Sequence, residues 1–166
     1  MQYELSTDEF YAYGHLYEPW AYVDTEIVLT DYIEESKLSK AVSMALFRMP
    51  YYKVRISVAT KPERYVLESN LNEFKVVRED DFLPFTDPRS GDHLITVSFS
   101  SRTIRIRISH VLCDAYGMNL FISFLLCAYC EKNEESYKPL ELTADRSVLA
   151  LEYDNPFDHI VPLDEI

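Results

Sequence analysis

The chain has 166 residues, of which 48% are hydrophobic, enough for one domain with a substantial core. Its formal net charge of -12 argues against a nucleic-acid backbone or an anionic membrane surface as a partner, because both would be repelled. Three cysteines, an odd number with no secreted disulfide pattern, and an acidic N-terminus without an apolar core predict a cytoplasmic protein with no signal peptide.

The first elements are a strand at 22–30 and a helix at 35–48. The helix is indicated by apolar residues that share one face, namely Leu38, Ala41, Val42 and Ala45. Pro50 cannot continue a helix, so the chain is expected to leave it there and enter a strand at 51–59.

Four further strands follow, at 64–69, 74–78, 93–100 and 103–110. Ser100-Ser101-Arg102 can join the last two as a hairpin, and a second helix is predicted at 117–132. The fold class is therefore α+β, with a mixed, mainly antiparallel sheet flanked by helices. Residues 1–166 are taken as a single lobe whose last part, about 133–166, is a charged linker or crossover segment.

His110 and Asp114 stand where the strand at 103–110 ends and the second helix begins. His110 is in phase with Ile104, Ile106 and Ile108, so its imidazole is expected to point into the protein, where its basicity can be tuned. Asp114, four residues later, could support a ring nitrogen if the chain turns tightly. The alternative is a core histidine satisfied by a local carboxylate.

The second helix is apolar nearly all round, from Leu120 to Cys130, but this run is too short to span a bilayer. Cys127 and Cys130 have redox-motif spacing, and core packing is the favoured interpretation. Cys113 could act as a nucleophile with His110 as its base, although residues three apart on a turning loop seldom have suitable geometry.

Three basic residues, Arg48, Lys53 and Arg55, lie between the first helix and the following strand. In a chain short of cations, one of them could pair with Asp114 across the core. The alternative is that all three are ordinary surface charges.

The H-x-x-x-D sequence of His110 and Asp114, followed by Ala115 and Gly117, resembles the chloramphenicol acetyltransferase-like superfamily, whose signature is H-x-x-x-D-G. This superfamily includes peptide-synthetase condensation domains and alcohol acetyltransferase-like proteins. Ser109 stands where many members have a second histidine, and Ala115 replaces the glycine. The run from Arg48 through Pro50 to Lys53 is similar to the end of the family's first helix, and the resemblance covers about residues 1–160.

The resemblance implies acyl transfer from the thioester of coenzyme A or of a phosphopantetheinyl carrier protein to an alcohol or amine, with no tightly bound cofactor. His110 would be the general base, Asp114 would hold the loop through a cation matching Lys53, and Tyr116 and Gly117 would border the substrate. The two-lobed members imply that a second lobe, or a second copy as in one-lobed relatives, completes the site.

Two alternatives belong to other classes. One is a binding or regulatory module that kept this fold and lost catalysis. The other is a metal site at His110 and Asp114, which needs a third ligand, and His15, His93 and His159 show no matching spacing. No metal is therefore expected.

Overall fold

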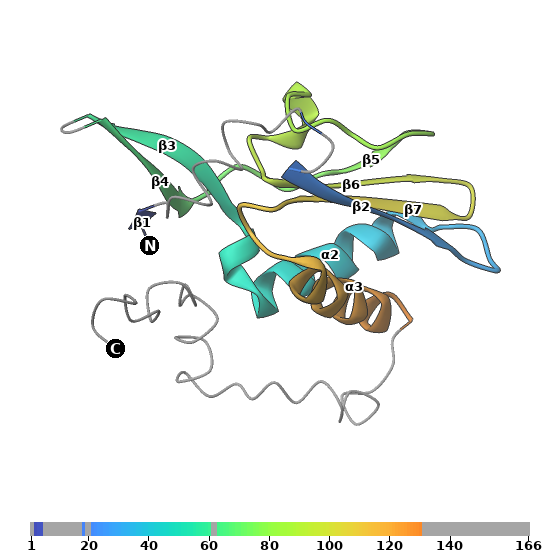
Figure 1. The fold of residues 1–166 in the computed structure, drawn as a ribbon. Helices are drawn as coiled ribbons and strands as arrows, with labels where there is room; N and C mark the ends of the chain where they lie inside the picture. The colour runs from blue at the N-terminus through green and yellow to red at the C-terminus, as the bar shows by residue number, and fades with distance from the viewer. Residues whose placement is uncertain (1, 5–17, 19–20, 61–62, 131–166) are drawn as a thin grey trace, which may run out of the picture. The chain divides into compact units, whose positions relative to one another are not determined.

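The computed structural model describes residues 2–4, 18, 21–60 and 63–130 (Figure 1). The chain divides into two compact units, Met1–Lys132 and Asn133–Ile166. The whole second unit, and with it the predicted linker at 133–166, lies outside the described residues.

Four strands and two helices build the part that carries the site. The strands are β2 (Tyr22–Val28), β5 (Val76–Arg78), β6 (Ile95–Ser100) and β7 (Thr103–Ser109), in the order β2-β7-β6-β5. β7 pairs antiparallel with β2 and β6, and β5 pairs parallel with β6. The helices α2 (Glu35–Arg48) and α3 (Ala115–Tyr129) lie side by side against one face of this sheet (Figure 1).

The alternation of β7 explains that packing. Ile104, Ile106 and Ile108 are completely buried and belong to one core cluster with Leu38 of α2 and Phe121 of α3. The opposite face carries Arg105 and Arg107 and similar polar residues, as the two-residue period of a strand requires.

A second, three-stranded sheet has the order β1-β4-β3 and is antiparallel throughout. Its strands are β1 (Gln2–Glu4), β3 (Val54–Thr60) and β4 (Glu63–Ser69). Between α2 and β3 the chain forms a 3-10 turn, Pro50–Tyr52, as the proline at its start favours. The predicted class, a mixed and mainly antiparallel α+β fold with flanking helices, is confirmed; β1 was not predicted.

Two predicted boundaries beside the motif are wrong by a residue or two, with consequences for the site. The strand predicted to reach residue 110 ends at Ser109, and the helix predicted to start at 117 starts at Ala115. The helix starts earlier because Asp114 is its N-cap residue, a role for which aspartate is well suited.

The burial of β7 predicts a large effect on stability. Ile106→Ala should lower the free energy of unfolding by about 2 to 5 kcal/mol, because it removes buried methyl groups and leaves a cavity. Urea denaturation of the full chain measures this. The control is Val28→Ala, at a side chain that is 73% exposed, which should change stability by no more than about 0.5 kcal/mol. Equal effects of the two substitutions would contradict the described core.

Candidate active site

His110 lies in a turn that is tied to both neighbours of β7. The backbone N–H of Ser109 donates to the carbonyl of Leu94 (2.9 Å), and that of His110 donates to the carbonyl of Ala21 (2.9 Å). The N–H of Leu112 then donates back to the carbonyl of Ser109 (2.9 Å), which closes the turn. The backbone of His110 is therefore fixed at the end of the sheet.

The imidazole of His110 is exposed, so the expectation that it points into the core is wrong. The last strand pair joins Tyr22 and Ser109, and Ser109 is completely buried. Because the chain turns immediately after this pair, the two-residue alternation of β7 does not extend to His110. The ring is thus carried by rigid backbone but faces outward from the described part of the chain.

One ring nitrogen of His110 has a defined partner. Nδ1 lies 3.2 Å from the carbonyl oxygen of Cys113. A carbonyl oxygen can only accept, so Nδ1 carries the proton when the ring is neutral and donates it to this oxygen. Nε2 then keeps its lone pair.

The sequence suggested that Asp114 could contact a ring nitrogen of His110, but it does not. Its Oδ1 accepts a hydrogen bond from the backbone N–H of Gly117 (2.9 Å), and its carbonyl accepts from the N–H of Met118 (3.0 Å). Both are N-terminal bonds of α3, where a carboxylate also interacts favourably with the helix dipole. Asp114 is therefore a helix cap, and it holds the far end of the turn that carries His110.

Within the described residues, no ion pair joins Asp114 to one of the three basic residues that the sequence offered as partners. Arg55 pairs with Glu68 on the neighbouring strand (2.7 Å). The guanidinium of Arg48 lies over the ring of Phe124, 5.3 Å from its centroid. No described ion pair links Lys53 to Asp114. The register of β3 and β4 sets the first of these partners, because Arg55 stands directly opposite Glu68.

Tyr116 and Gly117, expected to border the substrate, occupy different environments. The side chain of Tyr116 is 67% exposed. Gly117 faces the interior: a Cβ atom placed on it would lie 2.7 Å from Cβ of Cys113 and 3.0 Å from the hydroxyl of Tyr52. The structure thus gives Gly117 a packing contact, while substrate contact at either residue stays a prediction.

Tyr52 lies beside Gly117 and Cys113 in the core, a position that the sequence did not predict. It is completely buried, its ring lies 5.2 Å from that of Phe121, and its hydroxyl has no hydrogen-bond partner. Burial, followed by the nearby Cys113 thiol, raises the pKa of this hydroxyl, so it stays protonated. Its position between Pro50 and Lys53 was the one available signal in the sequence.

Burial raises the pKa of the Cys113 thiol to about 11, against a smaller lowering by the Tyr52 hydroxyl. A thiol with this pKa is almost entirely protonated at neutral pH and is a poor nucleophile. The environment of Cys113 therefore opposes the nucleophile interpretation and makes it a packing residue below the turn.

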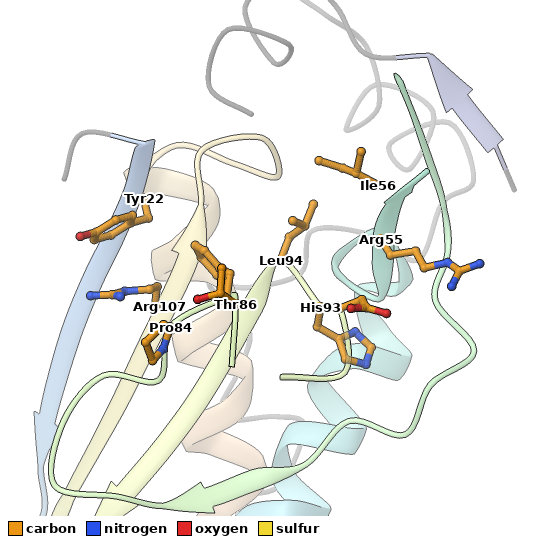
Figure 2. Close-up of a pocket in the computed structure, with 10 residues that line it drawn as sticks. Tyr22, Arg55, Ile56, Pro84, Thr86, His93, Leu94 and Arg107 are labelled. Carbon is orange, nitrogen blue, oxygen red and sulfur yellow. The ribbon is translucent and has the colours of Figure 1, made fainter. Parts of the chain in front are cut away.

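A pocket of about 500 Å³ adjoins the end of β7. It is lined by Tyr22, Arg55, Ile56, Arg107 and residues 84–86 and 92–94. Figure 2 shows Tyr22, Thr86 and Arg107 in front of the four-stranded sheet, Arg55 and Ile56 of β3 to the right, and the helices behind, so the pocket lies between the polar face of that sheet and β3. Two lining residues, Tyr22 and Leu94, are the strand partner and the hydrogen-bond acceptor of Ser109.

The cations of this pocket are neutralised by carboxylates. Arg107 donates from Nε and Nη2 to the two oxygens of Asp24, both at 2.7 Å, and stacks over the ring of Tyr22 at 4.1 Å. Arg55 is held by Glu68. The lining was not predicted, because it combines five segments that only the tertiary fold brings together.

His93, although it lines the pocket, has a structural environment. It is 1% exposed, Nε2 lies 3.3 Å from the carbonyl oxygen of Asn72, and its ring lies 5.0 Å from that of Phe74. Burial, as the largest cause, lowers the pKa of His93. The ring is therefore neutral at physiological pH and braces the loop before β6.

Within the described residues, no group of three or more His, Cys, Asp or Glu side chains is placed to hold a metal ion. In the same part of the chain, neither helix combines the length and the apolar character needed to cross a bilayer.

Comparison with solved structures identifies the fold. A variant of the starter condensation domain of rhizomide synthetase RzmA superimposes with a TM-score of 0.60 at 12% identity, covering 89% of this chain and 46% of that chain. Polyketide synthase associated protein 5 from Mycobacterium tuberculosis gives 0.57 at 14% identity, covering 76% and 32%. An F. graminearum protein complexed with coenzyme A and T-2 mycotoxin gives 0.53 at 11% identity, covering 80% and 40%.

These matches show a condensation-domain-like fold of the chloramphenicol acetyltransferase-like kind. The chain spans less than half the length of each of these solved structures. No protein-family model matches the sequence, and no curated protein is similar to it.

The capping role of Asp114 can be tested by a matched pair of substitutions. Asp114→Ala should destabilise the chain by about 1 kcal/mol, because the N–H of Gly117 loses its acceptor, whereas Asp114→Asn should stay close to wild type. Thermal and urea denaturation measure both. If Asn were as destabilising as Ala, the carboxylate would have a role other than capping.

The raised pKa of Cys113 predicts its reactivity. Alkylation of Cys113 by iodoacetamide should be slow at pH 8 and accelerate about tenfold per pH unit up to a pKa of about 11, because only the thiolate reacts. Peptide mass spectrometry follows the reaction, with exposed Cys130 as the internal comparison. Labelling of Cys113 at pH 7 as fast as that of Cys130 would contradict the buried environment.

Proposed function

We propose that this chain is an acyltransferase, or the first lobe of one, that moves an acyl group from a thioester to an alcohol or amine with His110 as general base. The observation that carries the proposal is the arrangement of His110. Its backbone N–H donates to the carbonyl of Ala21, the N–H of the preceding Ser109 donates to the carbonyl of Leu94, and its Nδ1 faces the carbonyl of Cys113. The rest of the imidazole is open to a substrate. The fold supports this interpretation.

The proposed reaction uses this arrangement of His110. Nε2 accepts the proton of the acceptor O–H or N–H while the acceptor atom attacks the thioester carbonyl carbon. The tetrahedral intermediate then collapses, the carbon–sulfur bond breaks, and the imidazolium returns its proton to the leaving thiolate. Throughout, the Nδ1–H bond to the Cys113 carbonyl keeps the ring in place and stabilises the imidazolium.

The donor we propose is acyl-coenzyme A or an acylated phosphopantetheinyl carrier protein. One structure of the same fold is complexed with coenzyme A, and another, at a TM-score of 0.56, with C8-CoA and Leu-SNAC. We propose that such a thioester is a substrate and that no cofactor is tightly bound. The acidic chain with its free cysteines favours a cytoplasmic setting with neither nucleic acid nor membrane as partner.

We propose that the acceptor enters the pocket lined by Tyr22 and Leu94, the two residues that hold the backbone of Ser109. Ile56, Phe85 and Leu94 supply apolar contact, while Thr86 and Asp92 supply polar groups. Since Arg55 and Arg107 are already paired with carboxylates, the pocket suits a neutral acceptor, or one carrying hydroxyl or amino groups, better than an anion.

The exposed imidazole implies a covering element in the active protein. Acyl transfer competes with hydrolysis of the thioester, so water must be excluded from the reacting centre. We propose that a second lobe, or a second copy of the chain, closes over His110 and Tyr116. The coverage of less than half of the matching structures supports this.

The second candidate is a binding or regulatory module of the same fold without catalysis. The observation that favours it is the electrostatic surroundings of Asp114, which has no basic partner in the described part of the chain. The presence of Ala115 in place of the signature glycine also favours the binding module. Such a module would bind thioesters without turning them over.

Turnover of the full chain distinguishes the two candidates. We expect acetyl-CoA and octanoyl-CoA, offered with a panel of small alcohols and amines, to release free coenzyme A. The rate should fall about 10²-fold to 10⁴-fold in His110→Ala, the usual loss when a general base is removed. The control, Asn119→Ala at an exposed position of α3, should keep the wild-type rate. Equal, measurable rates for wild type and His110→Ala would overturn the assignment of His110 as the base, and no release of coenzyme A above background by wild type would favour the binding module.

A further inference from the structure

We propose that Gly117 is a positioning residue for His110, acting through Cys113: with no side chain at 117, α3 lies close enough to keep the carbonyl of Cys113 against Nδ1 of the imidazole. The inference deepens the proposed function and rests on His110 being its base. It concerns the tautomer of the ring, which can be measured without any turnover.

There is no space for a side chain at position 117. A Cβ atom there would lie 2.7 Å from Cβ of Cys113, closer than real carbon atoms approach without bonding, and 3.5 Å from its sulfur. On another side it would lie 3.0 Å from the hydroxyl oxygen of Tyr52. Any side chain at 117 therefore requires Cys113 or α3 to move.

Tyr52 and the first turn of α3, which surround Gly117 on its other sides, are held in place. Tyr52 is completely buried, with its ring 4.8 Å from that of Tyr51 and 5.2 Å from that of Phe121. The N–H of Gly117 is held by the Asp114 carboxylate at 2.9 Å, which fixes the first turn of α3. The displacement would consequently fall on Cys113, which lies in the turn.

The backbone conformation at Gly117 does not itself require a glycine. Among the described glycines, Gly91 has a positive φ and Gly117 does not. Within a helix, alanine is favoured over glycine because glycine loses more backbone freedom. Glycine at 117 therefore lowers helix propensity in exchange for the close contact with Cys113.

A displacement of Cys113 would affect His110 through a single hydrogen bond. Nδ1 and the carbonyl oxygen of Cys113 are 3.2 Å apart, near the long end of the usual range, so a shift of a few tenths of an ångström removes the bond. The neutral ring would then revert to the Nε2–H form that free histidine prefers. In that tautomer Nε2 has no lone pair with which to accept the acceptor's proton.

The test is long-range ¹H–¹⁵N NMR of the full chain at about pH 8.5, where histidine is neutral. The resonances of His110 are assigned by comparison with His110→Gln. Wild type should show mainly the Nδ1–H tautomer, and Gly117→Ala should shift His110 to mainly Nε2–H. Asn119→Ala, on the same helix, should leave the tautomer unchanged. In the double variant Cys113→Gly with Gly117→Ala, the clashing Cβ atom is gone and the Nδ1–H signal should return.

A wild-type tautomer in a folded Gly117→Ala variant would overturn the inference, and so would a double variant that stays in the Nε2–H form. If Gly117→Ala does not fold, Cys113→Gly alone decides. With no side chain at either position the turn no longer packs against α3, so the Nδ1–H population should fall, whereas in the double variant the methyl group of Ala at 117 fills the space of the Cys113 side chain. An unchanged population in Cys113→Gly would overturn the inference. If the tautomer depends on residue 117 but the protein turns over no thioester, the proposed function is wrong and the positioning role of Gly117 still holds.

Discussion

The structure of the site depends on the burial of one face of β7 against α2 and α3. Ile104, Ile106 and Ile108 are completely buried there, and hydrogen bonds to β2 and β6 hold both edges of the strand. A strand that is held along both edges and on its apolar face ends at a defined residue, Ser109. The turn that follows begins from rigid backbone, so a few local bonds are enough to set the imidazole of His110.

The local elements of this arrangement could be predicted because they follow sequence periodicity. Alternation defines β7, the apolar face of 35–48 defines α2, and Pro50 separates that helix from β3. The orientation of His110 could not be predicted, because periodicity does not tell at which residue a strand stops. That end is set by carbonyl groups distant in sequence, those of Ala21 and Leu94.

Electrostatic partners were predicted less well, for a related reason. Strand register chooses them: Arg107 stands opposite Asp24 and Arg105 opposite Glu26, and each pair is joined at 2.7 Å. Register is a long-range property, so the sequence alone did not give Glu68 as the partner of Arg55. The cap at Asp114 was missed for a different reason, because the helix start was placed at 117, although an aspartate three residues before a backbone N–H at a helix start is a common N-cap.

The central claim is that the neutral imidazole of His110 accepts a proton during acyl transfer, and the pH dependence of kcat/KM for thioester turnover tests it most directly. The account predicts that kcat/KM falls tenfold per pH unit on the acid side, with an apparent pKa equal to that of His110 titrated by NMR in the same protein. A profile that stays flat through the titration of His110 would contradict the account.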